Sequence, residues 1–180
     1  MLVYVFWHTP RSGAAPGEYA GALAAFQSAF GRTGLARGIQ SFRLDPVGWF
    51  QPEAACYIDC YEIESSAQLE AINEAAVSGG CAVPHQAIAA LAGAGMGSLY
   101  RYEHRGCAVS EAGHSVWFSK PEGMSYAELR GLLSPLHGAD NAVLQRFLAL
   151  GGSPEFCLLS KSETALPDGL AGCHRALTKI

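Results

Sequence analysis

The sequence has little charge and no long hydrophobic run. Of its 180 residues only 16% are charged, and the formal net charge is -4. A chain without basic clusters cannot neutralise the phosphates of a nucleic acid or the headgroups of an anionic membrane. Its apolar stretches are too short to cross a bilayer, and residues 2–7 lack the flanks of a secretion signal. We therefore expect a cytoplasmic protein that binds neither nucleic acid nor membranes.

Recognisable catalytic and cofactor motifs are missing as well. The six cysteines include no Cys-x-x-Cys pair, and Cys56 and Cys60 stand too far apart on an expected strand to share a tetrahedral metal. His104, Cys107 and His114 lie near one another in the sequence, but no fourth ligand has a recognisable spacing. The sequence therefore predicts no metal, no cofactor, and free, buried thiols.

What the sequence does contain is a pattern that occurs twice. An aromatic strand, a proline turn and a Tyr-Ala helix occupy residues 5–10 and 18–20, and the same succession returns at residues 116–121 and 125–127. Internal repeats bear on the fold before any local motif does. Since hydrophobic residues make up 49% of the chain, both copies have enough apolar side chains to pack.

Periodicity and turn residues predict the elements of each copy. In the first copy we expect strands at 2–8, 38–44, 54–62 and 98–104, and helices at 18–30, 66–76 and 84–91, the last ending in glycine-rich 93–97. In the second copy we expect strands at 115–118, 143–150, 155–161 and 175–180, and helices at 126–136 and 167–173. The order βαββαβ is that of a ferredoxin-like plait. The sequence thus predicts an α+β fold of two such repeats, residues 1–106 and an abbreviated 114–180, joined by a linker at 107–113.

This order of elements resembles that of the dimeric α+β barrel superfamily, which includes antibiotic-biosynthesis-monooxygenase-like proteins. The segment 114–125, in which a His-apolar strand meets a Lys-Pro-Gly turn, is similar in outline to the opening of stress-responsive A/B barrel domains. The resemblance implies two plaits packed sheet to sheet as an α+β barrel within one chain. It also implies a site inside the barrel or between a sheet and its helices, and an activity such as cofactor-independent monooxygenation or isomerisation.

Alternation along the strands sorts candidate residues by face. One row of each strand is apolar (Val3, Val5, Trp7; Cys56, Ile58, Cys60), and the other is mixed aromatic and polar (Tyr4, Phe6, His8; Tyr57, Asp59, Tyr61). We expect the mixed rows to face the partner plait or a pocket. We also expect the first and third strands to be parallel neighbours, which would bring His8 near Asp59 or Tyr61.

A histidine beside a carboxylate and phenols can act as a general acid or base on a small planar substrate. His8 and Asp59 are therefore the catalytic candidates, and His85 is predicted to lie on the surface. The predicted binding residues for a small planar aromatic ligand are Tyr4, Phe6, His8, Tyr57, Asp59 and Trp117. The alternative is a non-catalytic ligand-binding or stress-associated module whose aromatic rows are interface core. Edge strands of such plaits can pair between chains, so a homodimer is also an expectation.

Overall fold

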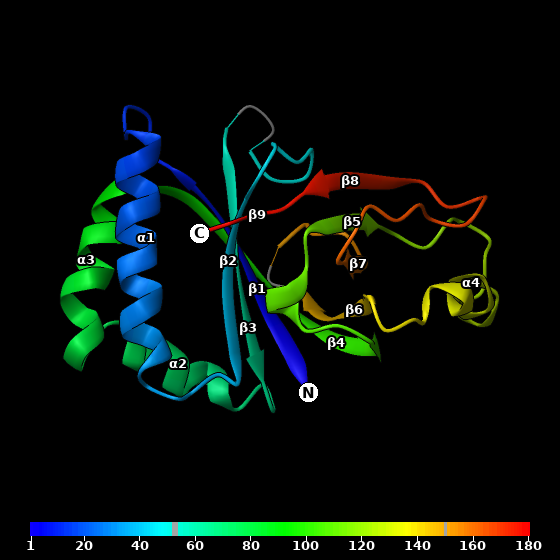
Figure 1. The fold of residues 1–180 in the computed structure, drawn as a ribbon, viewed down its shortest axis with the longest axis horizontal. Coiled ribbons are helices and arrows are strands. Elements are labelled where there is room, and N and C mark those ends of the chain that lie inside the picture. The colour runs from blue at the N-terminus through cyan, green and yellow to red at the C-terminus, as the bar shows by residue number, and fades with distance from the viewer. Residues whose placement is uncertain (52–53, 150) are drawn as a thin grey trace.

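All strands in the described residues belong to one antiparallel sheet. The computed structural model describes residues 1–51, 54–149 and 151–180. Its strands follow the spatial order β8-β5-β7-β6-β4-β1-β3-β2-β9 (Figure 1). Their bounds are β1 Leu2–Pro10, β2 Gly38–Leu44, β3 Cys56–Ile63, β4 Ala92–Arg105, β5 His114–Phe118, β6 Asn141–Ala149, β7 Phe156–Ser160, β8 Gly172–Ala176 and β9 Thr178–Lys179. The helices are α1 Pro16–Gly31, α2 Gln68–Ala76, α3 Ala82–Leu91 and α4 Tyr126–Leu133.

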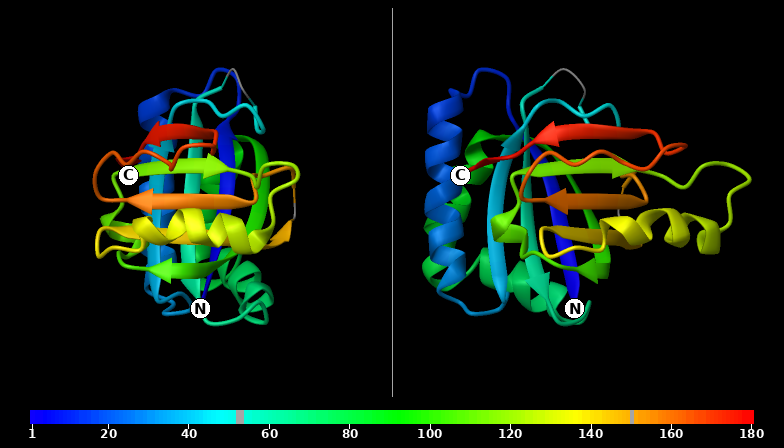
Figure 2. Two further views of the ribbon diagram at one scale, coloured as in Figure 1. Left: turned by 90° about the vertical axis from the view of Figure 1, so that its right-hand side faces the viewer. Right: turned by 45° about the vertical axis from the view of Figure 1, so that its right-hand side comes forward.

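The C-terminal segment nearly closes this sheet. β8 pairs with β5 at one edge and β9 pairs with β2 at the other, and only Leu177 separates β8 from β9. The long strand β4 joins the two halves by pairing with both β1 and β6. Figure 2 shows the strands β5 to β8 crossing in front of β1 to β3. The two edges of the sheet are thus joined by consecutive residues of the chain, which gives the sheet a barrel-like form.

The two halves of the sheet have matching strand orders. The first runs β4-β1-β3-β2 and the second β8-β5-β7-β6. The expectation that the first and third strands run parallel is wrong, because β1 pairs with β3 antiparallel. A crossover helix makes β1 parallel to β2, and a hairpin-type connection makes β3 antiparallel to β2, so β3 must also oppose β1.

Local sequence accounts for the helices, with one difference from expectation. α1 starts with a first-turn proline and buries Tyr19, Leu23, Phe26 and Phe30 at helical spacing. At α2 no serine caps the helix; instead the Gln68 side chain accepts hydrogen bonds from the backbone of Glu64 and Ser65. No helix in the described ranges is long and apolar enough to cross a membrane.

One expected helix is absent from the described structure, and one expected helix end is part of a strand. Residues 167–173 form a turn and the first residues of β8 rather than a helix, since the positive φ of Gly169 is not helical. Residues 93–97, expected as the end of a helix, are the start of β4. Leu150, expected to end a strand, lies outside the described residues.

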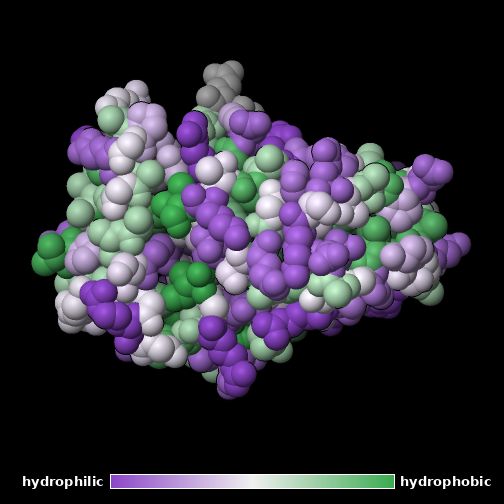
Figure 3. Space-filling view, viewed as in Figure 1, coloured by the Kyte–Doolittle hydropathy of each residue, from purple (hydrophilic) through white to green (hydrophobic). Residues whose placement is uncertain are grey.

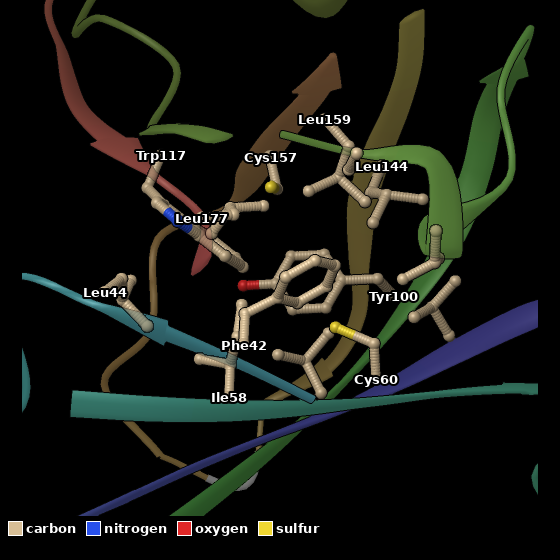
Figure 4. Close-up of a cluster of buried hydrophobic side chains, with 14 of the residues drawn as sticks. Phe42, Leu44, Ile58, Cys60, Tyr100, Trp117, Leu144, Cys157, Leu159 and Leu177 are labelled. Atoms are coloured by element: carbon tan, nitrogen blue, oxygen red, sulfur yellow. The ribbon is translucent and has the colours of Figure 1, made fainter. Parts of the chain in front are cut away.

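The core between the two sheet halves is filled by the apolar rows of the strands. Val3, Val5 and Trp7 point into it together with the apolar row of β3. In Figure 4, Phe42, Cys60, Tyr100, Trp117, Leu144 and Cys157 converge in this space. The ring of Trp117 packs edge-on against that of Trp7, with 5.1 Å between centroids. The inside of the barrel is therefore packed with side chains, and the mixed rows face the helices instead.

The outer faces of both halves are covered by helices. α1, α2 and α3 cover the first half, where Tyr19, Phe30, Ile72 and Leu91 contribute to a second core. α4 covers the second half through Leu129 and Leu133. On the face seen in Figure 3, hydrophobic residues are exposed only in separate small patches among hydrophilic ones.

We expect Trp117→Ala to lower the free energy of unfolding by about 3 to 5 kcal/mol, because it removes a large buried ring from the core between the halves. Urea denaturation measures this loss. Phe147→Ala removes an exposed ring and serves as the control, with an expected change within about 0.5 kcal/mol. A nearly neutral Trp117→Ala would show that the two halves do not depend on this contact.

Candidate active site

A cavity of about 370 Å³ lies between the first half of the sheet and its helices. The mixed row of β1 and part of that of β3 form its floor, α1 and α3 form its roof, and the start of β4 borders it. The lining residues are Tyr4, Phe6, His8, Tyr19, Leu23, Phe26, Phe30, Asp59, Tyr61, Ile72, Asn73, Ala76, His85, Ile88, Ala89, Ala92, Gly93, Ala94 and Gly95. Most of this lining is aromatic or aliphatic, and the polar groups are few, which is typical of small-molecule sites.

His8 and Asp59 meet at the floor of this cavity. Both residues are 4% exposed. His8 Nε2 lies 3.4 Å from Asp59 Oδ1, without the alignment of a hydrogen bond, so this nitrogen has no hydrogen-bond partner among the described residues. His8 Nδ1 lies 2.5 Å from the hydroxyl oxygen of Tyr19, which α1 presents from the opposite side. A buried polar nitrogen without a partner is uncommon in folded proteins.

Asp59 is held in place by hydrogen bonds from two hydroxyl groups. Ser41 on β2 donates to Oδ1 at 2.5 Å, and Tyr61 donates to Oδ2 at 3.2 Å. Gln27 of α1 in turn donates to the Tyr61 hydroxyl oxygen at 2.9 Å. These bonds stabilise a buried carboxylate and fix its direction relative to His8.

The phenols around the carboxylate are held in their protonated form. Burial, and secondarily the charge of Asp59, raises the pKa of Tyr4 and of Tyr19 above the usual 10.0. The same two causes raise the pKa of Tyr61 well above that value. These tyrosines are therefore hydrogen-bond donors at neutral pH.

The protonated Tyr19 also orients the imidazole. A neutral His8 whose Nδ1 accepts the Tyr19 hydroxyl hydrogen carries its own hydrogen on Nε2, facing the Asp59 carboxylate. The opposite tautomer would set an Nε2 lone pair against that carboxylate, which is electrostatically unfavourable. Tyr19, His8 and Asp59 thus form a chain that can hold and move one proton.

The structure gathers some of the predicted residues and separates others. Tyr4, Phe6, His8 and Asp59 line the cavity. Tyr57 is buried beside them, with its ring centroid 5.7 Å from that of His8, but it does not line the cavity. Trp117 lies on the other side of the sheet, in the core between the halves, because its row faces inward.

Sequence reasoning missed three groups in the lining. Tyr19 is predicted only as part of a helix face, although the Tyr-Ala motif puts it on the helix that follows the His8 strand. His85, predicted to be a surface residue, is half-buried and packs edge-on against Phe26, with 5.6 Å between centroids. Gly93 and Gly95, which line the cavity, are predicted to follow a helix end, yet their alternation with Gly97 is that of a strand face.

The histidines and cysteines outside the cavity do not assemble into a metal site within the described residues. His104 donates to the carbonyl of Gly138 and stacks on His137, with 4.6 Å between ring centroids. All six cysteines are free, and five of them are buried.

The fold and the cavity define an α+β protein with a nearly closed antiparallel sheet. No family model and no curated protein matches the sequence. Among solved structures the chain is similar to a "Putative monooxygenase" from Fusobacterium nucleatum subsp. nucleatum ATCC 25586, with a TM-score of 0.56 and 10% identity over 99% of this chain and 91% of that one. A second structure, of an anthrone oxidase-like protein, gives a TM-score of 0.48 and 11% identity over 99% and 90% of the two chains. At such identities the likeness to the Fusobacterium protein shows a shared fold and does not assign a chemistry.

We expect the free energy of unfolding to fall as the pH rises above about 10. The unfolded chain ionises its tyrosines there, whereas the raised pKa values of Tyr19 and Tyr61 keep the folded state protonated, so the unfolded state binds fewer protons. Tyr61→Phe should make this fall less steep, as measured by urea denaturation across alkaline pH. Titration of the folded protein, followed by tyrosinate absorbance, gives a second check. If all seven tyrosines ionise together near pH 10, the predicted loss of stability is contradicted.

Proposed function

We propose that the protein is a cofactor-independent enzyme of the monooxygenase kind that acts on a flat, uncharged aromatic molecule. One observation carries the proposal: a buried His8–Asp59 pair, with an unpartnered imidazole nitrogen, at the floor of an aromatic cavity of about 370 Å³. A strained or unpaired polar group in a cavity is typical of catalytic sites.

The charges in the cavity favour an uncharged substrate. Asp59 is the one carboxylate in the described lining, and that lining contains neither lysine nor arginine. A ligand carboxylate or phosphate would lose its hydration without gaining a cationic partner, which is unfavourable in an apolar cavity. Rings stacked on Tyr4 and Phe6 would instead bury apolar area and gain aromatic contacts.

The chain formed by Tyr19, His8 and Asp59 is the proton relay of the site. It suits a substrate that supplies the electrons for its own oxidation once a proton is removed. An activated ring CH₂ group loses a proton to the His8–Asp59 pair, and the negative charge spreads over the ring system and its oxygen. Dioxygen is the oxidant that accepts the electrons of this anion. Overall, a ring CH₂ and O₂ give a ring C=O and H₂O, so no bound cofactor is required for the electron balance.

Tyr4 stabilises the charge that forms in this step. Its phenol lines the cavity and stays protonated, because burial raises its pKa. Tyr4 makes no side-chain hydrogen bond within the described residues and is half-buried, so its hydroxyl can donate to a substrate oxygen. Fixed donors directed at a developing oxyanion are a main source of rate acceleration.

The fold supports this proposal in a coarse way. The Fusobacterium protein that shares the fold is described as a "Putative monooxygenase". We also infer that residues 1–106 and 114–180 are two copies of one plait, with the second copy lacking its second helix. The matching strand orders β4-β1-β3-β2 and β8-β5-β7-β6 support this inference.

We expect His8→Ala to lower the rate of oxygen consumption with anthrone by about 100-fold, the effect of losing a general acid-base group. Anthrone is chosen because it is flat and uncharged and carries an acidic ring CH₂ group. Oxygen uptake and product absorbance measure the rate in protein without added cofactor. Asp59→Asn should give a similar loss, because the relay then lacks its proton acceptor.

His174→Ala, an exposed histidine on β8, is the matched control and should retain the full rate. Equal rates in His8→Ala and the unaltered protein would remove the proton relay from the reaction. Saturable binding of anthrone without oxygen uptake would show a binding protein, or an isomerase that uses the same pair, rather than a monooxygenase.

A further inference from the structure

The rings of Tyr4 and Phe6 lie across two glycines of the neighbouring strand. A methyl group at Gly95 would come within 2.7 Å of Cζ of Phe6, and one at Gly97 within 2.7 Å of the hydroxyl oxygen of Tyr4. In the β1–β4 register, however, Gly95 stands opposite His8 and Gly97 opposite Phe6. Each ring therefore reaches diagonally over the adjacent strand, so it leans across the sheet rather than standing upright from β1.

These leaning rings form the floor of the cavity. The rings of Tyr4 and Phe6 are inclined by 30° with centroids 6.4 Å apart, and those of Phe6 and His8 by 19° with centroids 5.6 Å apart. Side chains at positions 95 and 97 would occupy the space where the ring tips lie and push them up toward α1 and α3. The volume above the floor therefore depends on the two missing side chains.

A structural role in the strand does not by itself account for glycine at positions 95 and 97. Glycine in a strand interior costs roughly 0.5 to 1 kcal/mol relative to alanine and provides no side chain for packing. Both glycines have φ values outside the left-handed region, so the backbone itself does not require glycine there. What a larger residue would meet in each case is a ring of the cavity floor.

A second observation at the same place points to a ligand. His8, opposite Gly95, is nine-tenths buried or more, lines the cavity, and has an Nε2 atom without a partner in the described part of the chain. The aromatic floor of the cavity thus ends at His8 Nε2, a polar atom that has no hydrogen-bond partner among the described residues.

We propose that Gly95 and Gly97 are specificity-determining residues, which select flat ring systems by allowing the Phe6 and Tyr4 rings to lie down as a stacking surface. A ring system stacks on this floor with its hydroxyl group toward His8, whereas a puckered ring of the same skeleton is too thick. This inference rests on the proposed aromatic ligand and adds the residues that impose flatness on it.

The test compares two probes with one skeleton, 2-naphthol and trans-decahydro-2-naphthol, by fluorescence quenching and calorimetric titration. The unaltered protein should bind the flat probe about tenfold more tightly, the size of one good aromatic contact. Gly95→Ala should weaken 2-naphthol binding about tenfold by raising the Phe6 ring. Gly21→Ala, on α1 with open space around it, is the matched control and should change nothing.

A double-mutant cycle shows whether the effect passes through the ring. In a Phe6→Leu background, Gly95→Ala should have less than about a twofold further effect, because no ring tip remains over position 95. Phe6→Leu alone should bring the affinities of the two probes closer together. This single variant keeps the test valid if Gly95→Ala fails to fold.

The outcomes separate the two proposals. If the unaltered protein binds both probes with equal affinity, selection for flat rings is overturned, but the proposed function is not. An equal effect of Gly95→Ala with and without Phe6 also overturns it, because the glycine would then act through the strand alone. No binding of 2-naphthol or anthrone overturns the proposed ligand class, and with it this inference.

Discussion

The structure depends on the alternation of side chains along β1, which packs against other elements on both of its faces. Val3, Val5 and Trp7 pack into the core between the two sheet halves, while Tyr4, Phe6 and His8 face α1 and α3. Since side chains alternate with a period of two, shifting this strand by one residue would put a histidine and a phenol into the packed interior. One strand thus fixes both the joining of the halves and the position of the cavity.

The cavity combines features that each reduce stability. It leaves space between a sheet and its helices, buries a carboxylate, and includes glycines in a strand interior. Hydrogen bonds from Ser41 and Tyr61 offset the burial of Asp59, but nothing in the described structure satisfies Nε2 of His8. Such concentrated departures from efficient packing are expected at functional sites.

Sequence reasoning brought His8 and Asp59 together, but the route to that result was partly wrong. Strand alternation placed both residues on mixed rows, which is correct, whereas the parallel pairing of their strands was an error that did not alter which strands are neighbours. Trp117 was wrongly placed for another reason. Alternation along a strand sorts side chains into two faces, but it does not show which face packs against helices and which packs against the other half of the sheet. The glycines of β4 were misread because glycine marks both helix ends and strands that other side chains overlie.

The sequence alone determined the order of the first-half elements, the apolar and mixed rows of the strands, and the absence of basic clusters. These follow from local propensity and from periodicity, which neighbouring residues encode. Only the tertiary structure decided that the C-terminal segment closes the sheet at both edges, that the mixed rows face α1 and α3, and that Tyr19 reaches His8. Those outcomes depend on how distant segments share the available space, because many arrangements satisfy the same local pattern and only packing distinguishes them.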